Sequence, residues 1–129
     1  MVGALESSRE REKAQALYYR TLAAAAVADA AASERLNELH ADEQHHLSRL
    51  TARLLELGHK PSDLGTVRAP DVRLDGWEAV AREREGEEVR WYESLLGRGL
   101  DDDTLGLVDE ILASERHHQR ELRGKWMSA

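Results

Sequence analysis

The sequence has 129 residues, enough to bury one hydrophobic core, and 33% of them are charged. With 41% apolar residues, it has the composition of a globular protein and not that of a disordered chain. It contains no cysteine, which excludes disulfides, thiolate metal sites, iron–sulfur clusters and cysteine nucleophiles. A formal net charge of −7 argues against a nucleic-acid surface and favours cations as ligands.

One long apolar run extends from Leu22 to Ala32. It is rich in alanine, it is interrupted by Asp29, and it lacks the flanks and position of a signal peptide. We therefore expect a cytoplasmic protein with no membrane partner.

Strong helix formers dominate the chain, so we expect an all-α fold. The first helix is predicted over about residues 5–30 and the second over 34–57, with Ser33 as the N-cap between them. Both prolines lie in the segment 58–76, which is predicted to be a long loop. The third helix is predicted over about 77–96 and the fourth over 103–124, separated by two glycines and an aspartate run that caps the last helix.

Short connections within each half predict two antiparallel hairpins. The loop of some 19 residues between them could cross the length of a bundle at about 3.3 Å per residue. This is the connectivity of a ferritin-like four-helix bundle, and we expect residues 1–129 to form a single domain of that kind. A flexible linker between two independent hairpins is the alternative.

The same tetrad occurs once in each half of the chain. Glu43-Gln44-His45-His46 lies in the second predicted helix, and Glu115-Arg116-His117-His118 lies in the fourth. Residues three apart share a helical face, so each Glu and the His three residues later can point at one ion. In both helices this pair fills a gap in the apolar stripe and is therefore predicted to face the core.

The first and third helices each add one core carboxylate. Glu12 belongs to the stripe that also contains Leu5, Ala16, Tyr19, Ala23 and Ala26. Glu85 belongs to the stripe that also contains Ala81, Val89, Tyr92 and Leu96. Because a tyrosine follows each glutamate after seven residues, we interpret the halves as an internal duplication.

Four buried carboxylates in one layer would repel each other strongly, and two divalent cations would neutralise them. Four carboxylates and two imidazoles suit iron, or manganese as second choice, better than calcium or structural zinc. The alternatives are a solvated polar layer or mis-phased helices. His45 and His117 are predicted surface residues, His40 a core-edge residue and His59 a loop residue, without metal-binding roles.

A Glu from two helices and a Glu-x-x-His from the other two resemble the ferritin-like di-iron carboxylate proteins. Over roughly 100 residues the chain is most similar to the rubrerythrin di-iron domain. The residues that carry this similarity are Glu12, Tyr19 and Ala23 and the segment Ala41-Asp42-Glu43-Gln44-His45-His46. Full rubrerythrins also carry an iron that the cysteines of a rubredoxin domain bind. This chain has no cysteine and therefore cannot bind such an iron.

The resemblance implies a ligand set of Glu12, Glu43, His46, Glu85, Glu115 and His118. In it Glu43 and Glu115 bridge two irons, Glu12 and Glu85 are terminal ligands, and each histidine completes one ion. Rubrerythrin-like proteins often carry an additional glutamate one turn after the first glutamate of the third helix, and Glu88 has this spacing from Glu85. Either Glu85 or Glu88, or both, would therefore be the metal ligand of the third helix. Tyr19 and Tyr92 would lie just outside the ligands.

The expected function is binding of two Fe(II) and their oxidation by O2 or peroxide, as in ferroxidases or rubrerythrin-like oxidoreductases. The alternatives are a non-catalytic metal-binding or iron-delivery module, a di-metal oxygenase acting on an organic substrate, and a helical interaction domain without metal. Cage-forming ferritins have longer chains with a fifth helix, so we expect a homodimer or small homo-oligomer.

Overall fold

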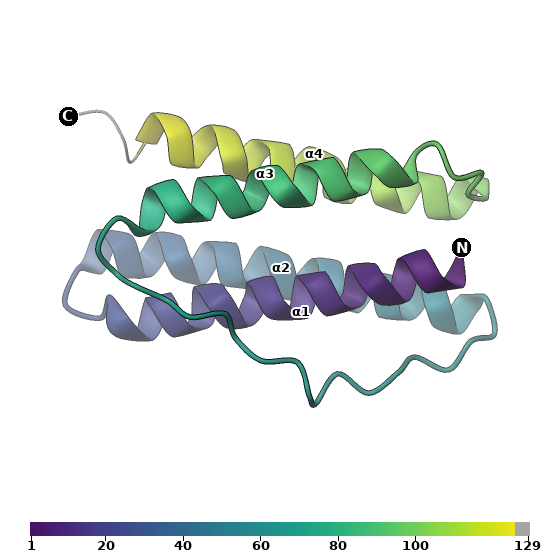
Figure 1. The fold of residues 1–129 in the computed structure, drawn as a ribbon, viewed down its shortest axis with the longest axis horizontal. Coiled ribbons are helices and arrows are strands. Elements are labelled where there is room, and N and C mark those ends of the chain that lie inside the picture. The colour runs from purple at the N-terminus through teal and green to yellow at the C-terminus, as the bar shows by residue number, and fades with distance from the viewer. Residues whose placement is uncertain (126–129) are drawn as a thin grey trace. The chain divides into compact units, whose positions relative to one another are not determined.

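The computed structural model describes residues 1–125, with side chains through residue 122. It contains four α-helices, α1 (Val2–Ala25), α2 (Ala30–Glu56), α3 (Trp77–Leu95) and α4 (Asp102–Lys125), shown in Figure 1. Within this part of the chain no residue forms a strand, and the helices pack in pairs. The all-α, four-helix prediction is therefore confirmed. None of the described helices combines the length and the hydropathy needed to cross a lipid bilayer.

Two compact units divide the chain, the first comprising Met1–Leu74 and the second beginning at Asp75. The first holds the α1–α2 hairpin with the loop that follows it, and the second holds the α3–α4 hairpin. In each unit a short connection returns the chain antiparallel to itself. Each predicted hairpin is thus present, and the pairing of α1 with α2 and of α3 with α4 follows from sequence proximity.

The α1–α2 hairpin buries one stripe of each helix, as the apolar spacing predicts. Leu5, Tyr19 and Leu22 of α1 are at most 1% exposed, and so are Leu36 and Leu50 of α2. Residues spaced by three, four and seven positions return to the same face of a helix, which explains why these leucines are buried together. Burial of each leucine side chain contributes about 2 kcal/mol.

The α3–α4 hairpin is built in the same way. Ala81, Tyr92 and Leu95 of α3 are fully buried, as are Val108 and Ile111 of α4. The prediction that Leu96 continues the buried stripe of α3 was wrong, because Leu96 is 38% exposed and Leu95 is buried instead. The helix ends at Leu95, so its last core contact comes three residues after Tyr92 and not four.

The break between α1 and α2 lies earlier than predicted. The N-cap of α2 is Asp29 and not Ser33, since Asp29 has an extended backbone and its Oδ1 accepts a hydrogen bond from the N–H of Ala32 at 3.1 Å. Alanine favours helix on both sides of the break, so only the capping side chain specifies where it occurs. Asp101 caps α4 in the same manner, accepting from the Thr104 N–H at 2.8 Å.

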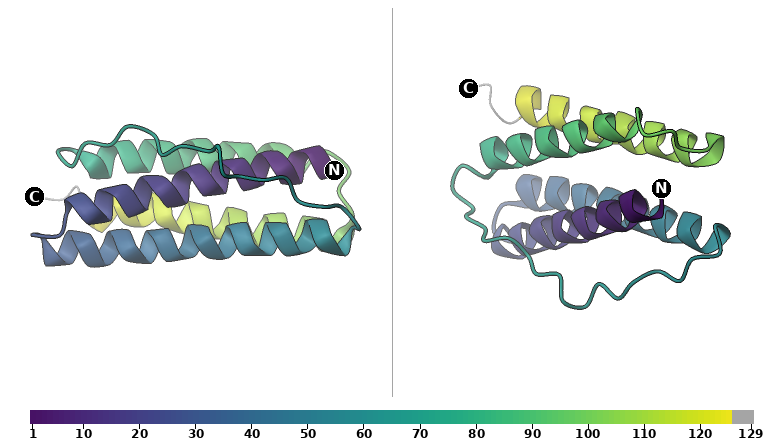
Figure 2. Two further views of the ribbon diagram at one scale, coloured as in Figure 1. Left: turned by 90° about the horizontal axis from the view of Figure 1, so that it is seen from below. Right: turned by 45° about the vertical axis from the view of Figure 1, so that its right-hand side comes forward.

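The long loop after α2 is fastened to the first hairpin by a buried arginine. The guanidinium of Arg9 donates to Glu6 Oε1 at 2.6 Å, to Thr51 Oγ1 at 2.9 Å and to the carbonyl oxygen of Ser62 at 3.1 Å. The Ser62 N–H donates to Glu6 Oε2 at 2.8 Å. Figures 1 and 2 show the loop running back along the length of this hairpin.

The attachment makes part of the stability of the first hairpin dependent on pH. Burial alone would raise the pKa of Glu6, but the hydrogen bonds from Arg9 and Ser62 and the charge of Arg9 outweigh it and hold this pKa below the ordinary value of 4.5. A carboxylate whose pKa is lower in the folded than in the unfolded state stabilises the fold, and this stabilisation is complete at pH values above the unfolded-state pKa. That contribution is lost as pH falls through the folded value.

We therefore expect Glu6→Gln to lower the free energy of unfolding by about 1 kcal/mol at pH 7, and by progressively less below pH 4.5. Urea unfolding of both proteins between pH 3 and pH 7 measures the difference. Glu10→Gln, an exposed change on the same helix, is the control and should alter stability little at any pH. If Glu6→Gln lowered the free energy of unfolding by the same amount at pH 3 and at pH 7, the role assigned to the charge of Glu6 would be contradicted.

Candidate metal centre

The first hairpin brings two carboxylates and one imidazole together in its interior. Nδ1 of His46 lies 3.5 Å from Glu12 Oε1 and 3.3 Å from Glu43 Oε1. Both glutamates are fully buried, and His46 is 5% exposed. One potential ligand atom from each of the three residues lies within 4.8 Å of the other two. This group is called the first half-site below.

The second hairpin repeats the arrangement with its own residues. Nδ1 of His118 lies 3.5 Å from Glu85 Oε1 and 3.1 Å from Glu115 Oε1. Both glutamates are again fully buried, His118 is 1% exposed, and the ligand atoms meet the same 4.8 Å limit. These three residues form the second half-site.

Helical spacing accounts for the construction of each half-site. The histidine follows its glutamate by three residues in α2 and in α4, so both side chains lie on one face. That face is the buried one, since Leu39 and Leu50 flank the pair in α2, and Ile111 and Leu122 flank it in α4. The remaining carboxylate comes from the antiparallel partner helix, which places Glu12 opposite His46 and Glu85 opposite His118.

Two buried carboxylates this close together destabilise the folded protein. Their charges repel each other, and removing each from water costs several kcal/mol unless a cation or hydrogen bonds compensate. A protonated imidazole can supply one positive charge per half-site, whereas a divalent cation supplies two and neutralises both glutamates. Each buried Glu/Glu/His group is therefore able to hold a metal ion.

The donor atoms restrict which metals fit. Carboxylate oxygen and imidazole nitrogen together suit iron, manganese and other first-row divalent ions, while calcium prefers oxygen alone. The sequence provides no thiolate. The residues thus fit the iron or manganese expected from the sequence, and the choice between these two metals stays a prediction.

Glu88, the reserve ligand, is buried at 7% exposure, but it does not belong to the groups of converging ligand atoms found among the described residues. The structure instead places Glu85 beside Glu115 and His118. Sequence reasoning missed Gln15, which is 1% exposed and occupies the position in α1 that Glu88 occupies in α3. Its spacing of three residues from Glu12 was the signal that could have found it.

Tyr19 and Tyr92 are fully buried two helical turns beyond Glu12 and Glu85. The rings of Tyr18 and Tyr19 meet edge to face, with centroids 5.3 Å apart and planes inclined at 62°. Aromatic pairs of this geometry stiffen a core beyond the effect of burial alone. A role of the two tyrosines next to bound metal stays a prediction.

The remaining histidines lie outside the half-sites. His45 and His117 are exposed, and His117 Nε2 contacts Glu121 Oε1 at 2.7 Å on the surface of α4. His40 is half-buried, with its Nε2 3.4 Å from Gln44 Nε2. Burial lowers the pKa of His40, helped by the positive charges of Arg20 and Lys13. The flanking histidines are therefore placed as the sequence predicts.

Replacing one buried carboxylate should separate its effect on the fold from its effect on metal binding. We expect Glu43→Gln to stabilise the metal-free protein by about 1 kcal/mol, because it removes one of two repelling charges. It should also remove the part of the stabilisation by Mn(II) that comes from the first half-site, which for one site should reach about 2.7 kcal/mol at a concentration one hundred times Kd. Thermal unfolding with and without Mn(II) measures both quantities.

The matched control is Glu34→Gln, an exposed change on the same helix that should keep the full response to Mn(II). An unchanged Mn(II) response in Glu43→Gln, or none in the unaltered protein, would contradict the assignment of this cluster as a metal site.

No protein-family model matches this chain, and no curated protein matches it either.

Proposed function

We propose that the protein binds two Fe(II), one on each half-site, and oxidises them with O2 or peroxide. The observation that carries this proposal is the repetition of one buried Glu/Glu/His group in both hairpins, with the Nδ1 atom of the histidine facing both carboxylates each time. The likeness to rubrerythrin-like sequences agrees with this assignment. We further propose that the half-sites combine into one dinuclear centre in which Glu43 and Glu115 are shared by both ions.

Charge balance supports two divalent ions. The four glutamates of the half-sites carry four negative charges when ionised, and two Fe(II) carry four positive charges. A single ion would leave two buried charges without compensation, which is costly in a protein interior. A pair of neutral imidazoles adds nitrogen donors without changing this balance.

The iron is the substrate in this reaction. Two Fe(II) each lose one electron, O2 takes up both electrons and two protons, and the products are two Fe(III) and one H2O2. With peroxide as oxidant, the two electrons cleave the O–O bond and two protons complete two water molecules. Carboxylate ligands favour the oxidation because they stabilise the higher charge of Fe(III).

The chain itself contributes binding, orientation and exclusion of water. Glu12 and His46 are held by α1 and α2, and Glu85 and His118 by α3 and α4, so the ligands depend on packed helices and not on loops. The leucines and tyrosines around them keep bulk water from the half-sites, which strengthens the attraction between carboxylate and cation.

Metal stoichiometry and oxidation provide the direct test. Anaerobic titration should show two Fe(II) bound per chain, and air should then produce ferric absorbance with consumption of about one O2 per two Fe(II). Glu115→Ala should reduce the rate of oxidation at least a hundredfold, while Glu110→Ala, an exposed change on the same helix, should not. Two Fe(II) bound without oxidation would favour the metal-delivery alternative, and no stoichiometric binding would end the proposal.

Magnetic coupling tests whether the half-sites form one centre. Two Mn(II) that share carboxylate ligands should couple, so the six-line electron paramagnetic resonance signal of isolated Mn(II) should be weak in the fully loaded protein. Glu12→Ala should lower the stoichiometry to one and restore the isolated-ion signal. If the loaded, unaltered protein gives two uncoupled Mn(II) signals, the half-sites work separately and the dinuclear part of the proposal is wrong.

A further inference from the structure

The surface of the first hairpin carries two cations beside a histidine and a glutamine. Lys13 and Arg20 of α1 are seven residues apart and therefore share one helical face. His40 and Gln44 of α2 are four residues apart and share a face as well, with their Nε2 atoms 3.4 Å apart. Arg20 and Gln44 are exposed, and Lys13 and His40 are half-buried. These four residues are called the basic patch below.

The register of the hairpin brings the two faces together. Glu12 lies opposite His46, with 3.5 Å between Oε1 and Nδ1. Because the helices are antiparallel, His40, six residues before His46, lies level with the position six residues after Glu12. Along the axis of α1 that position lies between Lys13 and Arg20, about 7.5 Å from the first and about 3 Å from the second. Burial lowers the pKa of His40, and the positive charges of Arg20 and Lys13 lower it further, which places both cations near the imidazole.

The two cations have no acidic partner in the hairpin. Within the part of the chain that the structure describes, neither Lys13 nor Arg20 forms an ion pair with a carboxylate. Glu38, an exposed acid of α2 close to His40 in sequence, is instead paired with Arg35 at 3.3 Å. Positive charges that lie close together repel each other, so an anion bound between them would stabilise this face.

The second hairpin shows which partner is missing. The offset of 73 positions between the half-site glutamates of α1 and α3 pairs Arg20 with Glu93. The offset of 72 positions between those of α2 and α4 pairs Gln44 with Arg116. NH2 of Arg116 lies 2.9 Å from Oε2 of Glu93, so side chains at these two positions meet across a hairpin. In the first hairpin an arginine replaces the acid, and an anion that binds there must come from outside.

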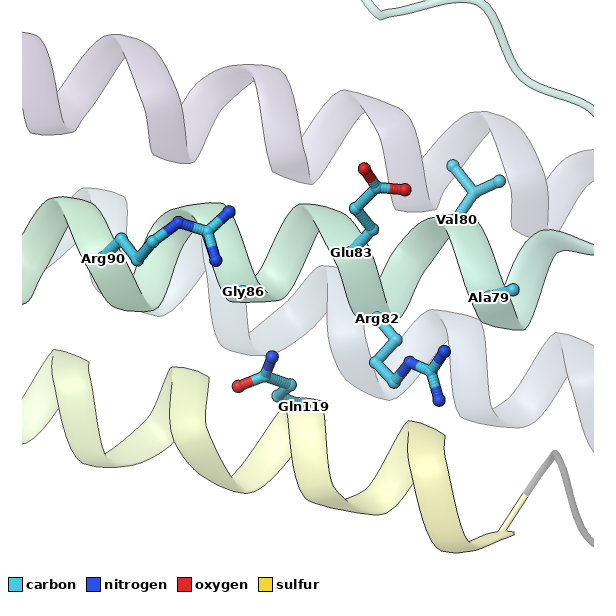
Figure 3. Close-up of a pocket in the computed structure, with 7 residues that line it drawn as sticks. All are labelled: Ala79, Val80, Arg82, Glu83, Gly86, Arg90 and Gln119. Atoms are coloured by element: carbon cyan, nitrogen blue, oxygen red, sulfur yellow. The ribbon is translucent and has the colours of Figure 1, made fainter.

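The second hairpin also has no counterpart of Lys13. The offset between α1 and α3 pairs Lys13 with Gly86, which lines an open groove, and Figure 3 shows Gly86 on α3 next to Gln119 of α4. A Cβ atom on Gly86 would lie 2.8 Å from Nε2 of Gln119, so any side chain there would displace the amide. The combination of two cations, an imidazole and an amide is therefore specific to the first hairpin.

We propose that the basic patch binds a phosphate dianion. Lys13 and Arg20 supply two positive charges that balance the two negative charges, in charge-assisted hydrogen bonds. The nitrogen atoms of His40 and Gln44, 3.4 Å apart, are spaced to bind adjacent oxygens of one tetrahedral ion. The imidazole and the amide can accept as well as donate a hydrogen bond, so they can also bind the proton that HPO4²⁻ keeps and sulfate lacks. The patch shares no side chain with the metal half-sites and does not depend on their function.

Histidine resonances of the full chain test the proposal, after a chelator and dialysis have removed metal that could itself bind phosphate. At pH 8 and constant ionic strength, inorganic phosphate should shift the ring resonance of His40 saturably and leave that of His117, exposed on α4, unchanged. Sulfate should bind at least tenfold more weakly. Phenyl phosphate presents the same dianion on an ester. Tighter binding of phenyl phosphate would identify an ester as the ligand, and equal or weaker binding would identify free phosphate.

Lys13→Gln and Arg20→Gln should each weaken phosphate binding at least tenfold, because each removes a charge-assisted hydrogen bond. Arg120→Gln, an exposed change on α4, removes the same charge outside the patch and should bind phosphate normally. Arg20→Glu combined with Gln44→Arg recreates the ion pair of the second hairpin and should abolish binding. Circular dichroism establishes that each variant keeps its helix content.

Three results would overturn the assignment of the basic patch as a phosphate site. The first is no saturable shift of the His40 resonance, and the second is equal affinity for sulfate and phosphate. The third is an equal loss of affinity in Arg20→Gln and Arg120→Gln, which would mean that only the net charge of the chain matters.

Discussion

Each hairpin is organised around one buried contact, in which an imidazole faces two carboxylates. Apolar packing alone would favour leucine at these positions, as it does one turn before Glu43 and one turn after His46. Placing charge there weakens the core unless a cation or a proton compensates. The remaining leucines, tyrosines and caps must therefore hold the helices together. They position the buried glutamates and histidines, which do not themselves stabilise the core.

Much of this was predictable, because helical periodicity assigns a side chain to a face before any contact is known. Glu12, Glu85 and the two Glu-x-x-His pairs interrupt apolar stripes, and that interruption predicted their burial. The start of α2 was not predictable in the same way, since alanine surrounds the break and only the Asp29 cap defines it. Gln15 and Arg9 were missed because long polar residues are usually exposed. The hydrogen bond that helps to bury Arg9 is accepted by the carbonyl oxygen of Ser62, which is distant in sequence.

The two halves are alike in their buried Glu/Glu/His groups and differ at other equivalent positions. At one pair of equivalent positions the first hairpin has Gln15 and the second has Glu88. At another pair Arg9 is covered by the chain's own loop, whereas Arg82 lines an open groove.

The matching caps of α2 and α4 have a consequence for how the sequence can change. Asp29 and Asp101 begin their helices the same distance, fourteen residues, before Glu43 and Glu115. Because each residue advances a helix by about 100°, one residue added or removed in that interval would turn the ligand pair away from the interior. The number of residues in each of these two intervals is therefore fixed by the need to keep the pair buried.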